Sequence, residues 1–303
     1  MSVIVDGISK TFGQQKALDN VSFSIDKGEV VGFLGPNGAG KSTMMKIATG
    51  YLTPDSGKVE ICGIDVATGG KEVRRLIGYL PEHNPLYLSM YVREYLSIIA
   101  GMYDVVNVAA RVDDMIDLTG LGREAHKRIG ALSKGYRQRV GIAQALIGNP
   151  EVVILDEPTT GLDPNQIVEI RELIRNVGHE HTLMLSTHIM QEVEAVCDSV
   201  IIIDRGKIKA QGKTAEIAIK ARGGETIEVE FNSDINTNML CEAVEAQDIE
   251  SIGNHTYKIT HNGQRDIRAD VFKFAVSNNY TMLGMRLLNS DMETLFHEVT
   301  KEE

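Results

Sequence analysis

"EVVGFLGPNGAGKST", residues 29–43, joins a short apolar run to a glycine-rich loop. The apolar run at 29–34 predicts a strand that is covered on both faces, and "KSTMMKIATG" after the loop predicts a helix that ends at Gly50. The loop itself fits the pattern G-x-x-x-x-G-K-[ST] through Gly35, Gly40, Lys41 and Ser42. Such a loop curls backbone N–H groups around phosphate oxygens at the start of a helix. We therefore expect a nucleotide site here.

Each part of this loop has an expected role. Lys41 should reach the outer phosphates, and the Ser42 hydroxyl should ligate Mg²⁺. The rest of the loop should surround the nucleotide through Pro36, Asn37, Gly38, Ala39 and Thr43. The alternative is a glycine-rich turn without a ligand, and the strand and helix on either side of the loop argue against it.

A second apolar run, "VVILDE" (152–157), ends in two acids. Open α/β sheets bind their ligands at the carboxyl ends of the strands, where Asp156 and Glu157 would emerge. Asp156 is expected to hold Mg²⁺ through water, and Glu157 to orient or deprotonate an attacking water. The alternative is a solvated acidic pair that caps a strand.

The rest of the chain predicts an α/β architecture. The segments 3–9 and 21–26 read as antiparallel strands, 57–66 as a further strand, and 181–188 as a buried strand. A helix at 164–178 separates this last strand from "EVVILDE". Strands that alternate with helices indicate a parallel sheet with helices on both faces.

Two further regions stand apart from this pattern. Helical patterns dominate residues 86–147, which predicts a helical insert. After "ARGGE" (221–225), a plausible linker, strands at 225–231, 255–260 and 282–288 alternate with helices around 236–245 and 266–279. We therefore expect a nucleotide-binding domain over 1–220 and a small α+β domain over 221–303.

Composition limits the function. Acidic residues number 42 against 31 basic ones, for a formal net charge of -11, which argues against a nucleic-acid partner. Cys62, Cys197 and Cys241 lie far apart, which indicates neither a disulfide framework nor a metal site. No run reaches the ~18 apolar residues of a membrane-spanning helix, and the start lacks a secretory pattern. A cytoplasmic protein is expected.

"ALSKGYRQRVGIAQAL" (131–146) places a hydroxyl, a glycine and several cations at one helix start. Ser133 near the N-cap and Gly135 beside it would make an anion site, because the first N–H groups of a helix are free. The alternative is an amphipathic helix with a polar cap, whose core face carries Val140, Ala143 and Ile147.

With these motifs in this order, residues 1 to about 215 resemble the ABC ATPase family. "LSKGYRQRV" resembles a variant of the family's LSGGQ signature, in which Ser133 and Gly135 are kept. "EPTTGLDP" is similar to its D-loop and supplies Asp163, and "STH" resembles its switch loop and supplies His188. The resemblance implies a P-loop fold with an antiparallel β subdomain and a helical subdomain, and it implies ATP and Mg²⁺ as ligands.

Three positions carry further implications of the resemblance. His188 would contact the γ-phosphate, although a lone histidine after a strand is more often structural. Phe12 in "KTFG" sits where the family stacks an aromatic on adenine, although it could be a core aromatic at a turn. Glu82 in "GYLPEH" occupies the Q-loop position, where the family has glutamine that lies near Mg²⁺ and the membrane subunit.

The family also implies partners. ATP would close a head-to-tail homodimer in which Ser133 and Gly135 of one protomer face the γ-phosphate on the other. A separate integral membrane permease would contact the helical insert and the Q-loop, with the chain peripheral on the cytoplasmic face of the inner membrane. The stretches "GYLPEHNPLY", "YVREYL", "LSKGYRQRVG" and "THIMQEVEAVCD" further resemble the ATP-binding subunit of the gliding-motility-associated ABC transporter of Bacteroidetes, of ABC-2 exporter type. The alternatives are export of drugs or polysaccharides, or an ABC ATPase without a transporter.

Overall fold

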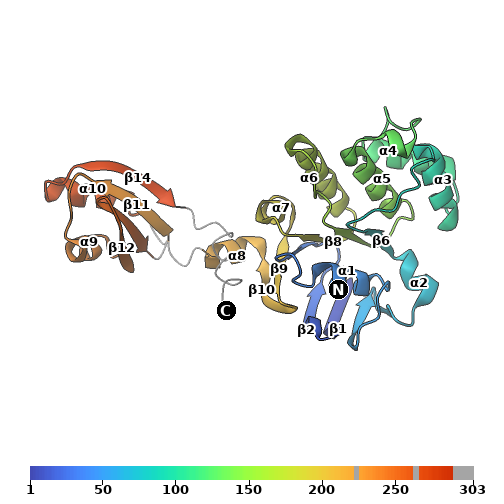
Figure 1. Ribbon diagram of the computed structural model, residues 1–303, viewed down its shortest axis with the longest axis horizontal. Coiled ribbons are helices and arrows are strands. Elements are labelled where there is room, and N and C mark those ends of the chain that lie inside the picture. The colour runs from blue at the N-terminus through green and yellow to red at the C-terminus, as the bar shows by residue number, and fades with distance from the viewer. Residues whose placement is uncertain (222–224, 262–265, 289–303) are drawn as a thin grey trace. The chain divides into compact units, whose positions relative to one another are not determined.

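The computed structural model describes residues 1–221, 225–261 and 266–288 (Figure 1). The chain forms two compact units, Met1–Thr214 and Ala215–Glu303, so the boundary falls slightly before residue 220. Residues 222–224 of the expected linker lie outside the described residues. Each unit has a core of its own.

The first unit begins with the antiparallel sheet that the sequence predicts. In the order β2-β1-β4-β5, its strands are Gln15–Ile25, Val3–Phe12, Ser56–Ile61 and Ile64–Asp65. In β2, the side chains of Val21, Phe23 and Ile25 are buried and the serines between them are exposed, because successive residues of a strand point to opposite faces.

The second sheet of this unit has six strands. In the order β10-β9-β3-β8-β7-β6, they are Lys207–Lys213, Ser199–Asp204, Val30–Leu34, Thr182–Thr187, Val152–Asp156 and Ile77–Leu80. All neighbours are parallel except β10, which runs antiparallel to β9. The three predicted buried strands are confirmed as β3, β7 and β8. The ends of these strands meet at one edge, which positions the loops that follow them.

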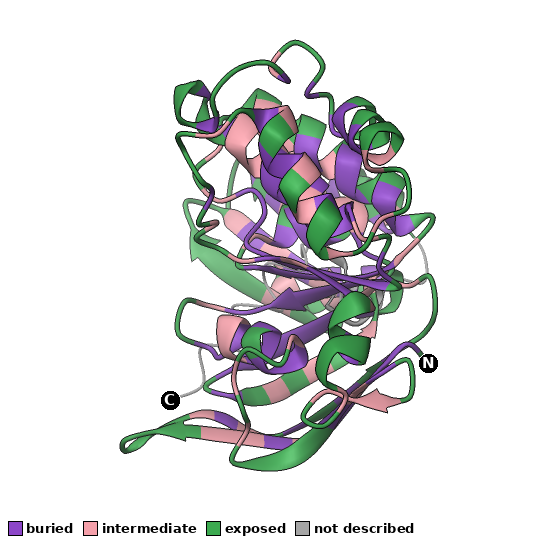
Figure 2. Cartoon of the chain, turned by 90° about the vertical axis from the view of Figure 1, so that its right-hand side faces the viewer, coloured by how far each residue is buried: buried purple, intermediate pink, exposed green. Residues whose placement is uncertain are grey.

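Helix α1 (Lys41–Ala48) lies between the two sheets. Its side chains Met44, Met45 and Ile47 are buried in one core with residues of both sheets, among them Phe33. Helices α5, α6 and α7 pack on strands of the six-stranded sheet. Figure 2 shows the buried strands crossing the middle of this unit, with helices on one side and the antiparallel strands on the other.

Residues 86–147, where a helical insert is expected, contain three α-helices and a 3₁₀ turn. These are α3 (Val92–Met102), α4 (Val108–Leu118), the 3₁₀ turn (Ile129–Ala131) and α5 (Lys134–Leu146). The remaining helices of the chain before residue 222 are α2 (Gly70–Arg75), α6 (Pro164–Gly178), α7 (Met190–Val196) and α8 (Thr214–Ala221). The helix predicted at 164–178 is therefore confirmed.

The second unit has the alternation of strands and helices that the sequence predicts. In chain order it contains β11 (Glu225–Phe231), α9 (Thr237–Val244), β12 (Asp248–Gly253), β13 (Thr256–His261), α10 (Arg268–Ser277) and β14 (Met282–Leu288). The sheet order is β12-β13-β11-β14 with antiparallel neighbours, which is the split βαβ arrangement of ferredoxin-like domains.

Across the described residues, the structure contains no helix with the length and apolar character that crossing a membrane requires.

Candidate functional site

The glycine-rich loop connects β3 to α1 with a backbone that only glycine tolerates at its end. Gly40 has a φ of 108°, and a Cβ there would lie 2.4 Å from the Ala17 carbonyl oxygen. Gly38 also has a positive φ of 82°. Helix α1 begins directly after Gly40 without a side-chain cap, so its first N–H groups and its dipole are available to an anion.

A pocket of about 510 Å³ opens at this helix start. Its lining combines residues from the P-loop and the β1–β2 hairpin with residues that follow β6, β7 and β8. They are Phe12, Gln15, Ala17, Asn37, Gly38, Gly40, Lys41, Ser42, Thr43, Glu82, Glu157, Thr160 and His188. Residues that lie far apart in the sequence meet here because the parallel strands end at the same edge of the sheet.

Glu157 joins Lys41 and His188 into one group in this pocket, through an ion pair to the lysine and a hydrogen bond to the histidine. The Lys41 Nζ lies 3.3 Å from Glu157 Oε1, and both side chains are buried. His188 Nδ1 lies 2.9 Å from Glu157 Oε2, which also accepts a hydrogen bond from the Thr160 hydroxyl at 3.0 Å. A carboxylate in contact with a histidine and a lysine can accept a proton and can also hold its neighbours in place.

Asp156, the last residue of β7, lies beside Ser42 of the P-loop. Its Oδ1 accepts hydrogen bonds from the Ser42 hydroxyl, at 3.1 Å, and from the Ser186 hydroxyl. Burial raises the pKa of Asp156, the two serine hydrogen bonds lower it, and the negative charges of Glu82 and Glu157 raise it further. Asp156 and Glu157 are only 1% and 7% exposed, so a solvated acidic pair is excluded.

The backbone of Glu157 is strained. Its φ is 50°, in the left-handed region that non-glycine residues seldom occupy. Its N–H donates to the Ser186 carbonyl and hydroxyl oxygens, at 3.2 and 3.1 Å. Strain of this kind persists where the surroundings fix it and is concentrated at functional sites. Ser186 therefore holds both acids of the β7 end.

Three residues of the predicted loop lie behind the pocket wall. Gly35 and Ala39 are buried, and none of Gly35, Pro36 and Ala39 is part of the lining. The carbonyl oxygens of Gly35 and Pro36 instead accept hydrogen bonds from Lys41 Nζ, at 2.8 and 3.2 Å. Gly35 and Pro36 therefore orient the lysine.

Phe12 and Glu82, whose roles were inferred from the family resemblance, both line the pocket. Phe12 ends β1 and is 51% exposed, so the alternative of a core aromatic is wrong. Glu82 follows β6 and lies in the same pocket as Ser42. His188 is exposed enough to meet a ligand while it is bonded to Glu157.

Ser133, Gly135 and Asp163 lie outside this pocket. Ser133 is the N-cap of α5, with its hydroxyl accepting from the Tyr136 N–H at 3.4 Å, and Asp163 is the N-cap of α6. The two helix starts pack closely, since a Cβ on Gly135 would lie 2.6 Å from the Gln166 side chain. In addition, the predicted core face of α5 is confirmed, with Val140, Ala143 and Ile147 fully buried.

The cations of α5 have structural partners. Arg139 pairs with Glu169 and also donates to the Thr119 carbonyl oxygen. Arg137 donates to the carbonyl oxygens of Ile129 and Gly130. Arg139 thus pairs with an acidic neighbour, whereas Arg137 binds the backbone of the 3₁₀ turn.

Sequence reasoning assigned no role to four residues of the site: Gln15, Ala17, Thr160 and Ser186. Gln15 pairs with Phe12 across the β1–β2 turn, which lies beyond the predicted strands 3–9 and 21–26, so that prediction carried no signal for it. Ser186 and Thr160 stand inside the quoted motifs "STH" and "EPTTGLDP", but their hydrogen bonds to Asp156 and Glu157 require the tertiary structure.

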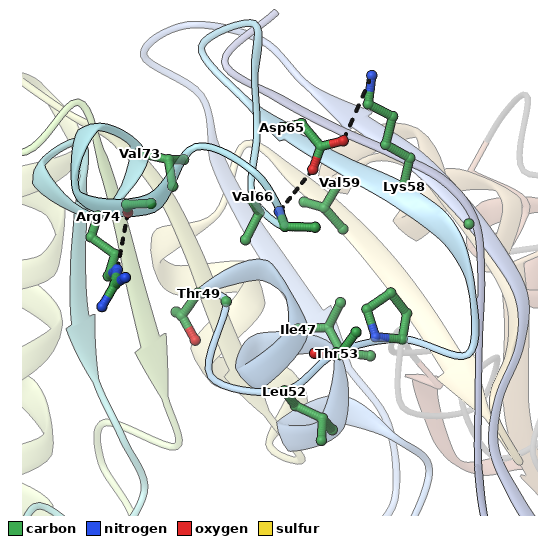
Figure 3. A pocket seen from close by; sticks show the side chains of 15 residues that line it. Ile47, Thr49, Leu52, Thr53, Lys58, Val59, Asp65, Val66, Val73 and Arg74 are labelled. Atoms are coloured by element: carbon green, nitrogen blue, oxygen red, sulfur yellow. Dashed lines mark hydrogen bonds and ion pairs between the residues drawn. The ribbon is translucent and has the colours of Figure 1, made fainter.

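A second pocket of about 310 Å³ lies at the other end of α1 (Figure 3). Its side chains include the aliphatic residues Ile47, Leu52, Val59 and Val73. The acid at its rim, Asp65, accepts from the Ala67 N–H and lies 4.0 Å from Lys58 Nζ. The lining of this second pocket contains no histidine and no second carboxylate that could take part in catalysis. The P-loop pocket is therefore the candidate active site.

The donor set around Ser42 suits a small hard cation. In the described residues, no group of three or more His, Cys, Asp and Glu side chains forms a complete metal site. Mg²⁺ typically takes one or two protein oxygens, several waters and the phosphates of its nucleotide. The adjacent oxygens of Ser42 and Asp156 fit that pattern.

Known proteins share this architecture. Residues 18–160 match the family model described as ABC transporter. The Nod factor export ATP-binding protein I of Ralstonia nicotianae is 31% identical, over 99% of this chain and 94% of that protein. The bacitracin transport ATP-binding protein BcrA of Bacillus licheniformis is 40% identical, over 69% of each chain.

A solved structure agrees with these relatives. The dimeric post-hydrolysis ATP-binding cassette MJ0796, bound to ADP and Pi, superimposes with a TM-score of 0.64 at 27% identity. The match covers 70% of this chain and 98% of that one. By its sequence, its P-loop fold and its site, the chain belongs to the ABC transporter family and is an ABC ATPase.

Proposed function

We propose that this chain is the motor subunit of an ABC exporter, in which ATP hydrolysis at the P-loop pocket drives a separate membrane permease. The observation that carries the proposal is the contact of Lys41, Glu157 and His188 in one pocket beside Ser42 and Asp156. This set contains a cation for phosphate, a base and an orienting histidine.

Each residue of the pocket has a role in this proposal. Lys41 turns from Glu157 toward the outer phosphates, since phosphate oxygens compete for its ammonium. Glu157 then orients or deprotonates the attacking water, and His188 contacts the γ-phosphate while it holds the Glu157 carboxylate. Phe12 stacks on the adenine at the pocket's rim.

Ser42, Asp156 and Glu82 would hold Mg²⁺ in this site. Bound there, the cation neutralises charge that develops on the phosphates. The chain's own contribution is to fix the ligands: Ser186 donates to Asp156, and Ser42 stands at the first turn of α1. Glu82 adds a second negative charge to the same region, which a cation would offset.

The proposed partners are a second copy and a permease. The cassette MJ0796 forms a dimer in its solved structure. A head-to-tail dimer of this chain would place Ser133, Gly135 and Asp163 against the nucleotide of the partner protomer, and their position outside the pocket of their own protomer suits that role. A permease would hold the pair at the cytoplasmic face of the inner membrane, with contacts to the helical insert and the Q-loop.

The roles for which the relatives are named favour export. A Nod factor export protein matches nearly the whole chain, so the comparison extends through the second unit as well. The narrower assignment to gliding motility rests on the sequence resemblance alone. Drugs or polysaccharides are the alternative cargo of such an exporter. The competing class of protein is an ABC ATPase that works without a permease.

Two measurements test the proposal. Affinity purification of the full chain from detergent-solubilised membranes should recover a polytopic permease, whose identity narrows the cargo. The purified chain should hydrolyse ATP, and Glu157→Gln should bind ATP without hydrolysing it and accumulate as a dimer on size exclusion. Normal hydrolysis by Glu157→Gln refutes the assigned base, and recovery without any membrane protein refutes the transporter.

A further inference from the structure

A lysine and an aspartate outside the pocket contact the aromatic residue at its rim. Lys10 Nζ lies 5.7 Å from the centroid of the Phe12 ring and 2.7 Å from Asp55 Oδ1. Lys10 is not part of the pocket lining, whereas Phe12 is. The ammonium therefore approaches the ring from outside the pocket.

Asp55 fixes this end of β1 in two ways. Strand β4 begins at Ser56, which pairs with Ser9, so the sheet offers β1 no partner strand on that side beyond Ser9. The second carboxylate oxygen of Asp55 takes over and accepts the Thr11 N–H at 2.7 Å, while the Asp55 N–H donates to the Ser9 carbonyl oxygen at 2.9 Å. One side chain thus holds the backbone before Phe12 and the cation over its ring.

This arrangement differs from an ordinary surface ion pair. The Lys10 side chain is only 15% exposed, although its partner Asp55 is 46% exposed, and its ammonium lies by the Phe12 ring. Phe12, in contrast, has half its surface free and lies beyond the last residues that β4 supports. A half-exposed ring at a strand end keeps rotational freedom unless a contact restrains it.

We propose that Lys10 and Asp55 are positioning residues for nucleobase binding: they hold the Phe12 ring so that its pocket face meets the purine. The inference rests on the proposed function, in which Phe12 stacks on adenine. A cation on one face of an aromatic ring is attracted by the ring's quadrupole, and a stacked base then occupies the opposite face. Lys10 acts through the ring and needs no contact with the nucleotide.

The test separates the base from the phosphates. Binding of ATP and of inorganic tripolyphosphate to the full chain is measured by calorimetry, because tripolyphosphate uses the P-loop and has no base. Lys10→Met should weaken ATP binding about two- to five-fold, which is the range of an exposed cation–π contact, and leave tripolyphosphate unchanged. Lys10→Arg should restore ATP binding, since guanidinium keeps both the ion pair and the ring contact.

Two controls make the result specific. Lys16→Met removes a neighbouring cation that pairs with Asp19, so it measures the effect of net charge on an anionic ligand. Phe12→Ala should weaken ATP binding by about five-fold or more, the range of one stacked base, and Lys10→Met should add nothing in that background. Asp55→Asn should resemble Lys10→Met in its selectivity for ATP.

A direct reading of the ring is also available, because the chain contains no tryptophan. Phe12→Trp introduces a single fluorophore, whose emission should be quenched by ATP and not by tripolyphosphate. In the same protein, Lys10→Met should reduce the quenching at a given ATP concentration.

The outcomes distinguish two failures. If Phe12→Ala binds ATP like wild type, base stacking itself is wrong, and the inference falls with it. If Phe12→Ala is impaired but Lys10→Met binds ATP normally, stacking stands and the positioning role is refuted. Equal losses of ATP and tripolyphosphate, or additive losses in the double variant, would likewise overturn it by showing a general structural effect.

Discussion

Glu192 on α7 has no contact with the pocket, yet it ties together two segments that carry the catalytic groups. It is 2% exposed and accepts hydrogen bonds from the hydroxyls of Thr159 and Thr187, the latter at 2.6 Å. Thr187 directly precedes His188, and Thr159 precedes the threonine that bonds Glu157. We predict that Glu192→Ala destabilises the first unit and slows hydrolysis.

The magnitude follows from the two hydroxyls that the change leaves without an acceptor. Thr159 and Thr187 are both buried, and a buried polar group without a partner costs about 1–3 kcal/mol, so the sum is about 2–6 kcal/mol. With a urea m-value of about 2–3 kcal/mol/M, the unfolding midpoint should fall by about 0.7–3 M. Circular dichroism during urea unfolding measures this shift.

Glu192→Gln is the matched control. Thr187 Oγ1 already accepts from the Ile189 N–H at 3.0 Å, so its own proton must go to residue 192. A glutamine can take that proton with its amide oxygen and donate its NH₂ to Thr159, whose hydroxyl is able to turn and accept. We therefore expect Glu192→Gln to lose about 1 kcal/mol or less.

Kinetics complete this prediction. Glu192→Ala should lower kcat about ten-fold or more, because each 1.4 kcal/mol of lost alignment is a factor of ten, while the Kd for ATP stays within about three-fold. The P-loop is untouched by the change. Wild-type stability in Glu192→Ala would refute the hydrogen-bond argument, and equal damage in both variants would show that the charge matters instead.

Three further predictions concern packing, metal and dimer. A Cβ at Gly78 would lie 2.1 Å from the Ala145 carbonyl oxygen, so Gly78→Ala should lower the free energy of unfolding, measured in urea, by about 1–3 kcal/mol. Gly101→Ala, where a Cβ meets nothing within 4 Å, should not lower it. Glu82→Gln should keep ATPase activity with a shallower Mg²⁺ dependence, since one negative charge leaves the site, and superimposable Mg²⁺ titrations would contradict this. Ser133→Arg should keep ATP binding by the monomer and lose hydrolysis, so that a parallel loss of monomer binding would exclude a role toward a partner protomer.

The parts of the fold that could be predicted have one feature in common: a local pattern decides them. Every residue of β3, β7 and β8 is buried because both faces of the sheet are covered, and the sequence shows this as short apolar runs within the three strands. β6, in contrast, has four residues, β10 alternates with charged residues, and β12 is mostly exposed. Their pairing depends on neighbours elsewhere in the chain, so local periodicity did not predict them.

In the candidate site, too, the sequence predicts some features and only the tertiary structure shows the others. Motif order predicted that Lys41, Glu157 and His188 would meet, because each follows a strand of one parallel sheet. It could not predict that Glu157 would bond both other residues, since this depends on a positive φ that Ser186 enforces. The roles of individual atoms thus came only from the tertiary structure.

Ser133, Gly135 and Asp163 lie outside the pocket of their own protomer, and local contacts hold them there. A Gly135 that packs against the Gln166 side chain and an Asp163 whose side chain caps α6 are held by helix starts on the surface of the first unit. The side chains of Ser133 and Asp163 cap their own helices through local hydrogen bonds, and these bonds do not bring them to the nucleotide site of the same chain. If Ser133 serves catalysis, a second protomer must bring the phosphate to it, and for this reason the proposed dimer is a requirement of the mechanism.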